Sequence, residues 1–300
     1  METASLRVSS SGWPATRETL AAYLALTKPR IIGLLLLTTV TTMLVADPGV
    51  AAETIAWTML GGYLAAGGAG AINHYLDREL DARMARTRNR PLVSGRISPR
   101  RGLAFGIALG IAAIVQLSLT VNALAALLAA TGLLGYVFVY TLWLKPLTPQ
   151  NIVIGGAAGA VPPLVGWAAA TGGLSADALY PFAIVFLWTP PHFWALSLLI
   201  KDEYARSGVP MLPVVRGEAE TRRQILAYSG LLVAVSVLPV IGGLFGAIYL
   251  GAALVLGGGF LALAWRLRAE PSREAALRLY LSSLAYLALL FCAMALDRLV

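Results

Sequence analysis

Cysteine is almost absent from this chain of 300 residues, and charged side chains are scarce. The single cysteine, Cys292, lies in an apolar run, cannot form an intrachain disulfide and is expected to be inert packing. Charged residues make up 13% and apolar residues 58% of the sequence, against about 25% and about 45–50% in soluble domains. These proportions exclude a soluble enzyme, a disordered chain and a disulfide-stapled domain.

Targeting signals are also lacking. The first 30 residues are polar, and no small-residue cleavage site follows an early apolar run, as a signal peptide requires. We expect residues 1–27 to form a short cytoplasmic tail. The net charge of +8 is not gathered on a soluble domain, so it does not indicate nucleic-acid binding.

Long apolar stretches are what the sequence has in abundance. One membrane span needs about 20 apolar residues, and helices leave no backbone polar group unpaired in lipid. We therefore predict an all-α polytopic membrane protein, a single integral-membrane domain over residues 1–300. Nine spanning helices are predicted, at about 28–46, 54–75, 102–120, 122–142, 151–171, 178–200, 224–243, 247–265 and 277–296.

Positive charge is segregated along the chain. Every lysine and arginine except Arg298 lies in the N-terminal tail or in a segment that follows an even-numbered span. The positive-inside rule then predicts a cytoplasmic N-terminus and an outside C-terminus, in the cell membrane. The long loops 76–101 and 201–223 would face the cytoplasm, where they are the segments with enough polar residues for a site.

The first polar constellation begins where the second span ends. Asn73, Asp77 and Asp81 are four residues apart and share one helical face. Two carboxylates at this spacing repel each other, whereas Mg²⁺ binds one or two carboxylates and completes its shell with water and phosphate oxygens. Arg86 and Arg90 follow, and arginine binds phosphate bidentately. The pattern predicts a diphosphate site; the competing interpretation is a solvated, salt-bridged loop.

The second constellation lies in the sixth span, within Trp188-Thr189-Pro190-Pro191-His192-Phe193-Trp194. Two prolines remove two backbone donors and favour a kink. His192 is expected roughly 12 Å below the cytoplasmic end of the helix. Either it contacts a substrate or it bonds a carbonyl that the prolines leave free. His74, at the interface, is either solvated or a further contact.

The stretch Asn73-x3-Asp77-x3-Asp81-x4-Arg86-Thr87-x2-Arg90-Pro91-Leu92 resembles the first aspartate-rich motif of the UbiA superfamily of intramembrane prenyltransferases. The runs LTKPR, YTLWLKPLTPQN, WTPPHFWAL and GVPMLP are similar to members that act on haem, and the resemblance covers roughly residues 24–297. It implies transfer of a farnesyl group from farnesyl diphosphate to a vinyl group of haem B, with Mg²⁺ as cofactor and haem B as a substrate.

The resemblance also implies roles for individual residues. Asp77 and Asp81 would hold magnesium, and Asn73 and Arg90 would be further catalytic residues. The substrate-binding residues would be Lys28, His74, Arg86, His192, Lys201, Asp202, Tyr204 and Arg206.

Loop 201–223 departs from the pattern of many relatives, which carry a second aspartate pair there. Here Asp202 is followed four residues later by Arg206. Three interpretations stay open: Asp202 or Glu203 supplies one carboxylate, Lys201 or Arg206 contacts phosphate directly, or the segment is a solvated helix end.

Two other functions fit parts of the pattern. A UbiA-type enzyme acting on an aromatic acceptor, such as a quinone precursor, shares the aspartate motif. A secondary transporter shares the broken helices, but ion-coupled transporters usually need carboxylates near the midplane. The expected partners are farnesyl diphosphate, haem B and bilayer lipid, with a downstream haem-modifying enzyme or an oxidase assembly left open.

Overall fold

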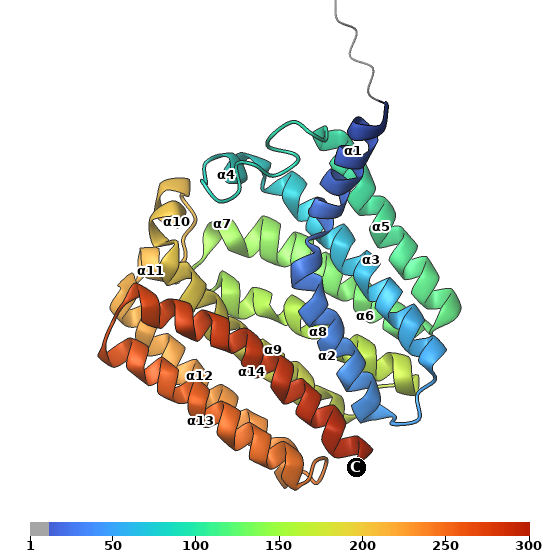
Figure 1. Ribbon diagram of the computed structural model, residues 1–300, viewed down its shortest axis with the longest axis vertical. Helices are drawn as coiled ribbons and strands as arrows, with labels where there is room; N and C mark the ends of the chain where they lie inside the picture. The colour runs from blue at the N-terminus through green and yellow to red at the C-terminus, as the bar shows by residue number, and fades with distance from the viewer. Residues whose placement is uncertain (1–11) are drawn as a thin grey trace, which may run out of the picture.

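The computed structural model describes residues 12–300, and these form an all-helical bundle (Figure 1). Nine helices of the described chain are long and apolar enough to cross a membrane, which confirms the predicted number. They are α2 (Pro29–Ala46), α3 (Ala52–Leu76), α5 (Pro99–Thr120), the segment Ala123–Leu147, α8 (Asn151–Thr171), the segment Ala176–Leu199, α12 (Gly217–Ile241), α13 (Ala247–Ala269) and α14 (Arg273–Leu299).

Two of these spans are composite. The fourth consists of α6 (Ala123–Leu134), the π-helix η1 (Gly135–Leu144) and the short α7 (Lys145–Leu147). The sixth consists of the 3-10 turn η2 (Ala176–Ala178) and α9 (Leu179–Leu199). A π-helix of this length is rare and is frequently found at functional sites.

Charged ends make several helices longer than their apolar stretches. Helix α12 begins at Gly217 rather than at 224, and its first turns carry ion pairs of Glu218 with Arg222 and of Glu220 with Arg223. Ion pairs at this spacing stabilise the polar first turns of the helix, which a prediction based on apolar residues leaves out. The predicted loop 201–223 is therefore mostly helical, with α10 (Lys201–Ser207) and α11 (Leu212–Val215) before α12.

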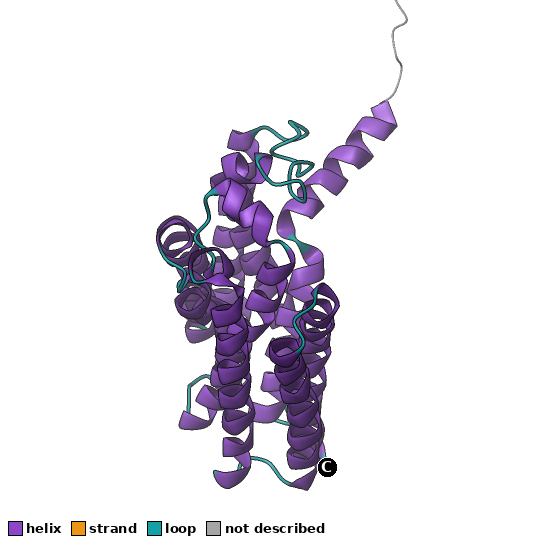
Figure 2. Cartoon of the chain, turned by 90° about the vertical axis from the view of Figure 1, so that its left-hand side faces the viewer, coloured by secondary structure: helices purple, strands orange, loops and turns teal. Residues whose placement is uncertain are grey.

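Short elements gather at one end of the bundle, which we call the loop end (Figures 1 and 2). It carries α1 (Gly12–Thr27), α4 (Arg78–Ala82), α10 and α11, whereas the C-terminus lies at the opposite end. The predicted tail is thus helical from Gly12 onward. Ala22 and Leu26 of α1 are buried in a cluster with Ala71 of α3.

Helix α3 is held close to α5 by glycines. A Cβ atom on Gly68 would lie 2.8 Å from the carbonyl oxygen of Gly106 and 2.9 Å from the backbone nitrogen of Gly110. Both contacts are with backbone, which cannot rotate away, so this close approach requires the absence of a side chain. The crossing fixes the helix whose end carries the aspartate motif.

Candidate active site

Asn73, Asp77 and Asp81 extend one helical face beyond the end of α3. Although α3 ends at Leu76, the backbone nitrogen of Asp77 donates to Asn73 O at 2.9 Å, and that of Asp81 donates to Asp77 O at 2.7 Å. The helical register therefore continues through the motif. All three residues are buried at the loop end, with at most 8% of their surface exposed.

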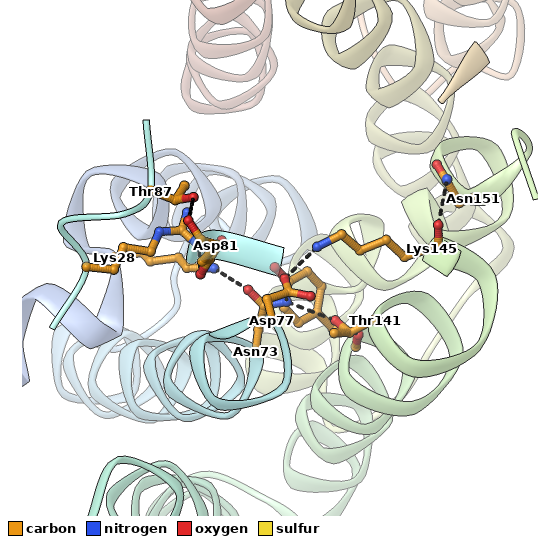
Figure 3. A network of polar contacts seen from close by, with 10 residues as sticks. Lys28, Asn73, Asp77, Asp81, Thr87, Thr141, Lys145 and Asn151 are labelled. Carbon is orange, nitrogen blue, oxygen red and sulfur yellow. Dashed lines mark hydrogen bonds and ion pairs between the residues drawn. The ribbon is translucent and has the colours of Figure 1, made fainter. Parts of the chain in front are cut away.

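Each aspartate is paired with a cation from another segment. Arg90 Nη1 lies 2.6 Å from Asp81 Oδ2, and Lys145 Nζ lies 2.5 Å from Asp77 Oδ2. Figure 3 shows Lys145 reaching the motif from one side and Lys28 from the other. Lys145 was missing from the predicted site, because a lone lysine at the end of a span is fully explained by the positive-inside rule.

Lys28 occupies a strained position between α1 and α2. Its backbone is left-handed, with φ 59° and ψ 54°, and among the residues described it is the one non-glycine with positive φ. Such a conformation costs about 1–3 kcal/mol, and Pro29 restricts it further. The strain directs Lys28 Nζ to Asn73 Oδ1, 2.7 Å away.

The charge on Lys28 is poorly compensated. Burial and, to a smaller extent, the neighbouring charge of Arg90 lower the pKa of Lys28 from 10.5 to about 7, against the opposing effect of Asp77. A bound anion beside Lys28 and Arg90 would favour the charged form of the lysine.

The amide of Asn73 links three segments. It accepts from Lys28, and its Nδ2 donates to Asp77 Oδ2 at 2.8 Å and to Thr141 Oγ1 at 3.1 Å. Thr141 belongs to the π-helix η1. Asn73 therefore orients Asp77 and joins α3 to the fourth span, which is a positioning task.

The second loop meets the first through Tyr204. This tyrosine of α10 is 5% exposed and packs in a cluster with Met84 and Met211. Burial raises the pKa of Tyr204, and the nearby charge of Arg86 opposes that effect. Tyr204 therefore packs against Leu80 and Met84, within and just after the aspartate motif, whereas the predicted phosphate ligand Arg86 is exposed.

Three other predicted residues of the second loop point elsewhere. Asp202 and Arg206 are exposed, and Lys201 forms an ion pair with Glu218 at 3.0 Å. Among the described residues, Glu203 has a buried carboxylate oxygen, Oε2, without a hydrogen-bond partner. Glu203 is half-buried and has one carboxylate oxygen shielded from solvent, whereas Asp202 is exposed.

The two histidines are both buried. His74 is 4% exposed, and neither ring nitrogen has a hydrogen-bond partner within residues 12–300, so the solvated interpretation is wrong. His192 is 9% exposed, and its Nδ1 lies 2.6 Å from Ser283 Oγ rather than on a carbonyl freed by the prolines. Its ring stacks on Trp188, with centroids 4.2 Å apart, and on Tyr280 at 4.9 Å.

The donor set suits a divalent cation that brings its own ligands. Within the described chain, no three His, Cys, Asp or Glu side chains come together to enclose a metal. Mg²⁺ does not need such a cage, because it binds through one or two carboxylates together with water and substrate phosphates. Asp77 and Asp81, one helical turn apart and buried, fit that requirement.

The chain matches the UbiA prenyltransferase family over residues 35–292 and belongs to that family. A protein of a Roseiflexus species named protoheme IX farnesyltransferase is 54% identical over 93% of this chain, but the chain spans only 52% of that relative's length. A Synechocystis protein of the same name is 50% identical, with 93% of this chain and 89% of the relative covered.

Solved structures share the fold at low sequence identity. A digeranylgeranylglyceryl phosphate synthase superposes with a TM-score of 0.75 at 20% identity, covering 94% of this chain and 99% of that chain. A UbiA homologue from Archaeoglobus fulgidus, solved with GPP and Mg²⁺ bound, has a TM-score of 0.67 at 16% identity, covering 91% and 99%.

Proposed function

We propose that this protein transfers a farnesyl group, within the membrane, from farnesyl diphosphate to a vinyl group of haem B, giving haem O and diphosphate. The observation that carries the proposal is the buried pair Asp77 and Asp81, surrounded by Lys28, Arg90 and Lys145. Identities of 50–54% to proteins named protoheme IX farnesyltransferase support the choice of substrates.

The reaction needs stabilisation of a leaving anion and protection of a cation. The C1–O bond of farnesyl diphosphate breaks, and its electron pair leaves with the diphosphate. The terminal vinyl carbon of haem B then forms a bond to C1. Water adds to the adjacent carbon and loses a proton, which gives the hydroxyethylfarnesyl group.

The cationic side chains suit the first of these steps. Lys28, Arg90 and Lys145 converge from three segments, so they can bind the oxygens of a diphosphate and hold its charge as the C1–O bond breaks. Asp77 and Asp81 would hold Mg²⁺, which when bound neutralises phosphate charge. The UbiA homologue solved with GPP and Mg²⁺ supports this assignment.

His192 is the proposed contact for haem. Because Tyr280 O, 2.6 Å from Ser283 Oγ, can only accept, we assign the proton of Ser283 to that bond and Nδ1–H of the His192 ring as the donor to Ser283. The neutral ring then carries its lone pair on Nε2, the form in which histidine binds iron. The flat faces of Trp188 and Tyr280 hold the ring in place.

The remaining residues have smaller proposed tasks. His74 and Tyr204 are proposed to contact the diphosphate. His74 is buried near the charges of Lys28 and Arg90, and Tyr204 is near that of Arg86. Glu203 replaces Asp202 as the proposed carboxylate of the second loop. We also propose that the loop end faces the cytoplasm, because its segments are rich in lysine and arginine and such segments stay on the cytoplasmic side of a membrane.

Labelled farnesyl diphosphate tests the proposed acceptor. The protein in lipid nanodiscs with Mg²⁺ is given haem B or 4-hydroxybenzoate, and the labelled product is identified by mass spectrometry. Farnesylated haem from haem B, and none from the benzoate, is the expected result. Prenylated benzoate would assign an aromatic acceptor, and absence of any transfer would overturn the proposal.

A further inference from the structure

The π-helix η1 brings four side chains to one face of the fourth span. At 100° per residue, an α-helix would place Tyr136 and Lys145 about 180° apart. At roughly 4.4 residues per turn, a π-helix places them within about 20°. The hydrogen bond from Thr141 Oγ1 to Tyr136 O, five residues earlier, follows this wider turn. Lys145 and Thr141 consequently reach Asp77 and Asn73.

Tyr136 and Tyr140 stand on the same face, beside the aspartate motif. Their rings stack with centroids 5.4 Å apart, and Tyr140 packs against the cluster that holds Met84 and Tyr204. Gly155 of α8 makes room for the second ring, because a Cβ there would lie 2.4 Å from Tyr140 Cδ2. The register of η1 and the missing side chain at Gly155 thus place two aromatic rings at the site.

One ring already faces a positive charge. Lys28 Nζ lies over the ring of Tyr136, 6.0 Å from its centroid. The face of an aromatic ring attracts cations through its quadrupole, at separations up to about 6 Å. A diphosphate that binds Lys28 would draw the ammonium away and leave the ring face to another cation.

We propose that Tyr136 and Tyr140 are catalytic residues whose ring faces stabilise the allylic cation formed when the C1–O bond of the prenyl diphosphate breaks. This inference rests on the proposed prenyl transfer. The electron pair of the broken bond leaves with the diphosphate toward Lys145 and Lys28, and the positive charge left on the allylic carbons is shared with the rings until the acceptor's vinyl group bonds to C1. The stabilisation comes from the rings and not from the hydroxyl groups.

Stepwise fluorination separates this role from packing. Tyr140 is replaced by phenylalanine and then by phenylalanines with one, two and three ring fluorines, and the same series is made at Tyr136. Each fluorine withdraws electron density from the ring face and changes its shape little. The single-turnover rate of prenyl transfer is measured in nanodiscs, so that product release does not limit it.

The expected result is a rate within a few-fold of wild type for Tyr140→Phe and a progressive fall to about one tenth for the trifluorinated ring. KM for the prenyl diphosphate should stay constant. The control is the same series at Phe260, which is buried against Tyr286 on the far side of the bundle from η1, and whose rate should not change.

Two outcomes would count against the proposals in different ways. A rate that is unchanged along both tyrosine series, in protein that still makes prenylated product, would overturn the role of the rings. A wild-type protein that transfers no prenyl group to any acceptor would overturn the proposed function itself. A variant that fails to fold is recognised because it lacks a cooperative thermal unfolding transition. Tyr136 and Tyr140 provide two independent series, so the test does not depend on one position.

Discussion

Lys145 Nζ lies 2.5 Å from Asp77 Oδ2, so the fourth span supplies the cation that neutralises a carboxylate at the end of the second. The two side chains are 13% and 10% exposed. Removing one partner of a buried ion pair leaves an uncompensated charge, which costs more than the pair contributes. The pair is therefore a condition for a stable ligand-free site.

Replacing Lys145 with methionine should destabilise the protein by about 3 kcal/mol. Asp77 would be left buried beside Asn73 alone, since its cation is gone. Thermal unfolding in detergent measures the effect. Arg278→Met is the control, because its pair with Glu274 is 53% and 71% exposed and should contribute little. Equal unfolding temperatures for the two variants would contradict the prediction.

Asp81→Asn should leave the protein inserted and folded but lower Mg²⁺-dependent prenyl transfer by at least about 100-fold. The amide keeps the shape of the side chain and loses the charge that pairs with Arg90 and that is proposed to hold Mg²⁺. Product formation is measured over a range of Mg²⁺ concentrations. Glu79→Gln, an exposed neighbour paired with Arg78, should keep full activity. Wild-type turnover in Asp81→Asn would remove it from the metal site.

Gly155→Ala should lower the transfer rate by about ten-fold or more, because the added methyl group must displace the ring of Tyr140. Gly159→Ala, one turn along the same helix, has no atom within 4 Å of the added carbon and should behave as wild type. Unfolding temperatures of both variants show whether the bundle is intact. Equal rates would mean that the position of Tyr140 does not matter for the reaction.

Ser283→Ala should weaken haem binding by about 10–100-fold, since the ring of His192 loses the partner that fixes its tautomer. The shift of the haem absorption band on titration measures binding, and farnesyl diphosphate binding should stay unchanged. Ser229→Ala is the control, because this buried serine donates to Ile225 O of its own helix, away from His192. Haem affinity unaffected by Ser283→Ala and by His192→Ala would place haem elsewhere.

The bundle was predictable because lipid imposes one simple requirement, an apolar helix of sufficient length. Nine such helices follow from the apolar stretches alone. Their polar ends were not predictable from hydropathy: α12 begins at Gly217 because ion pairs extend it below the apolar region.

The candidate site was predictable only where it is local in sequence. Asn73, Asp77 and Asp81 are brought together by one helical period, which the sequence displays. Lys145 is 68 residues from Asp77, and its face is set by a π-helix whose wider turn leaves no mark in an α-helical period. In the same way, the fold buries Tyr204, half-buries Glu203 and leaves Asp202 exposed, a difference that composition alone could not predict.

With Lys28 protonated, the three cations Lys28, Arg90 and Lys145 and the two carboxylates Asp77 and Asp81 give the ligand-free site one excess positive charge. Mg²⁺ alone would add to that excess, and a diphosphate of charge about −3 alone would reverse it. The two together bring the formal sum to zero. Each ligand should therefore raise the affinity for the other, so that metal and prenyl diphosphate load cooperatively rather than in independent steps.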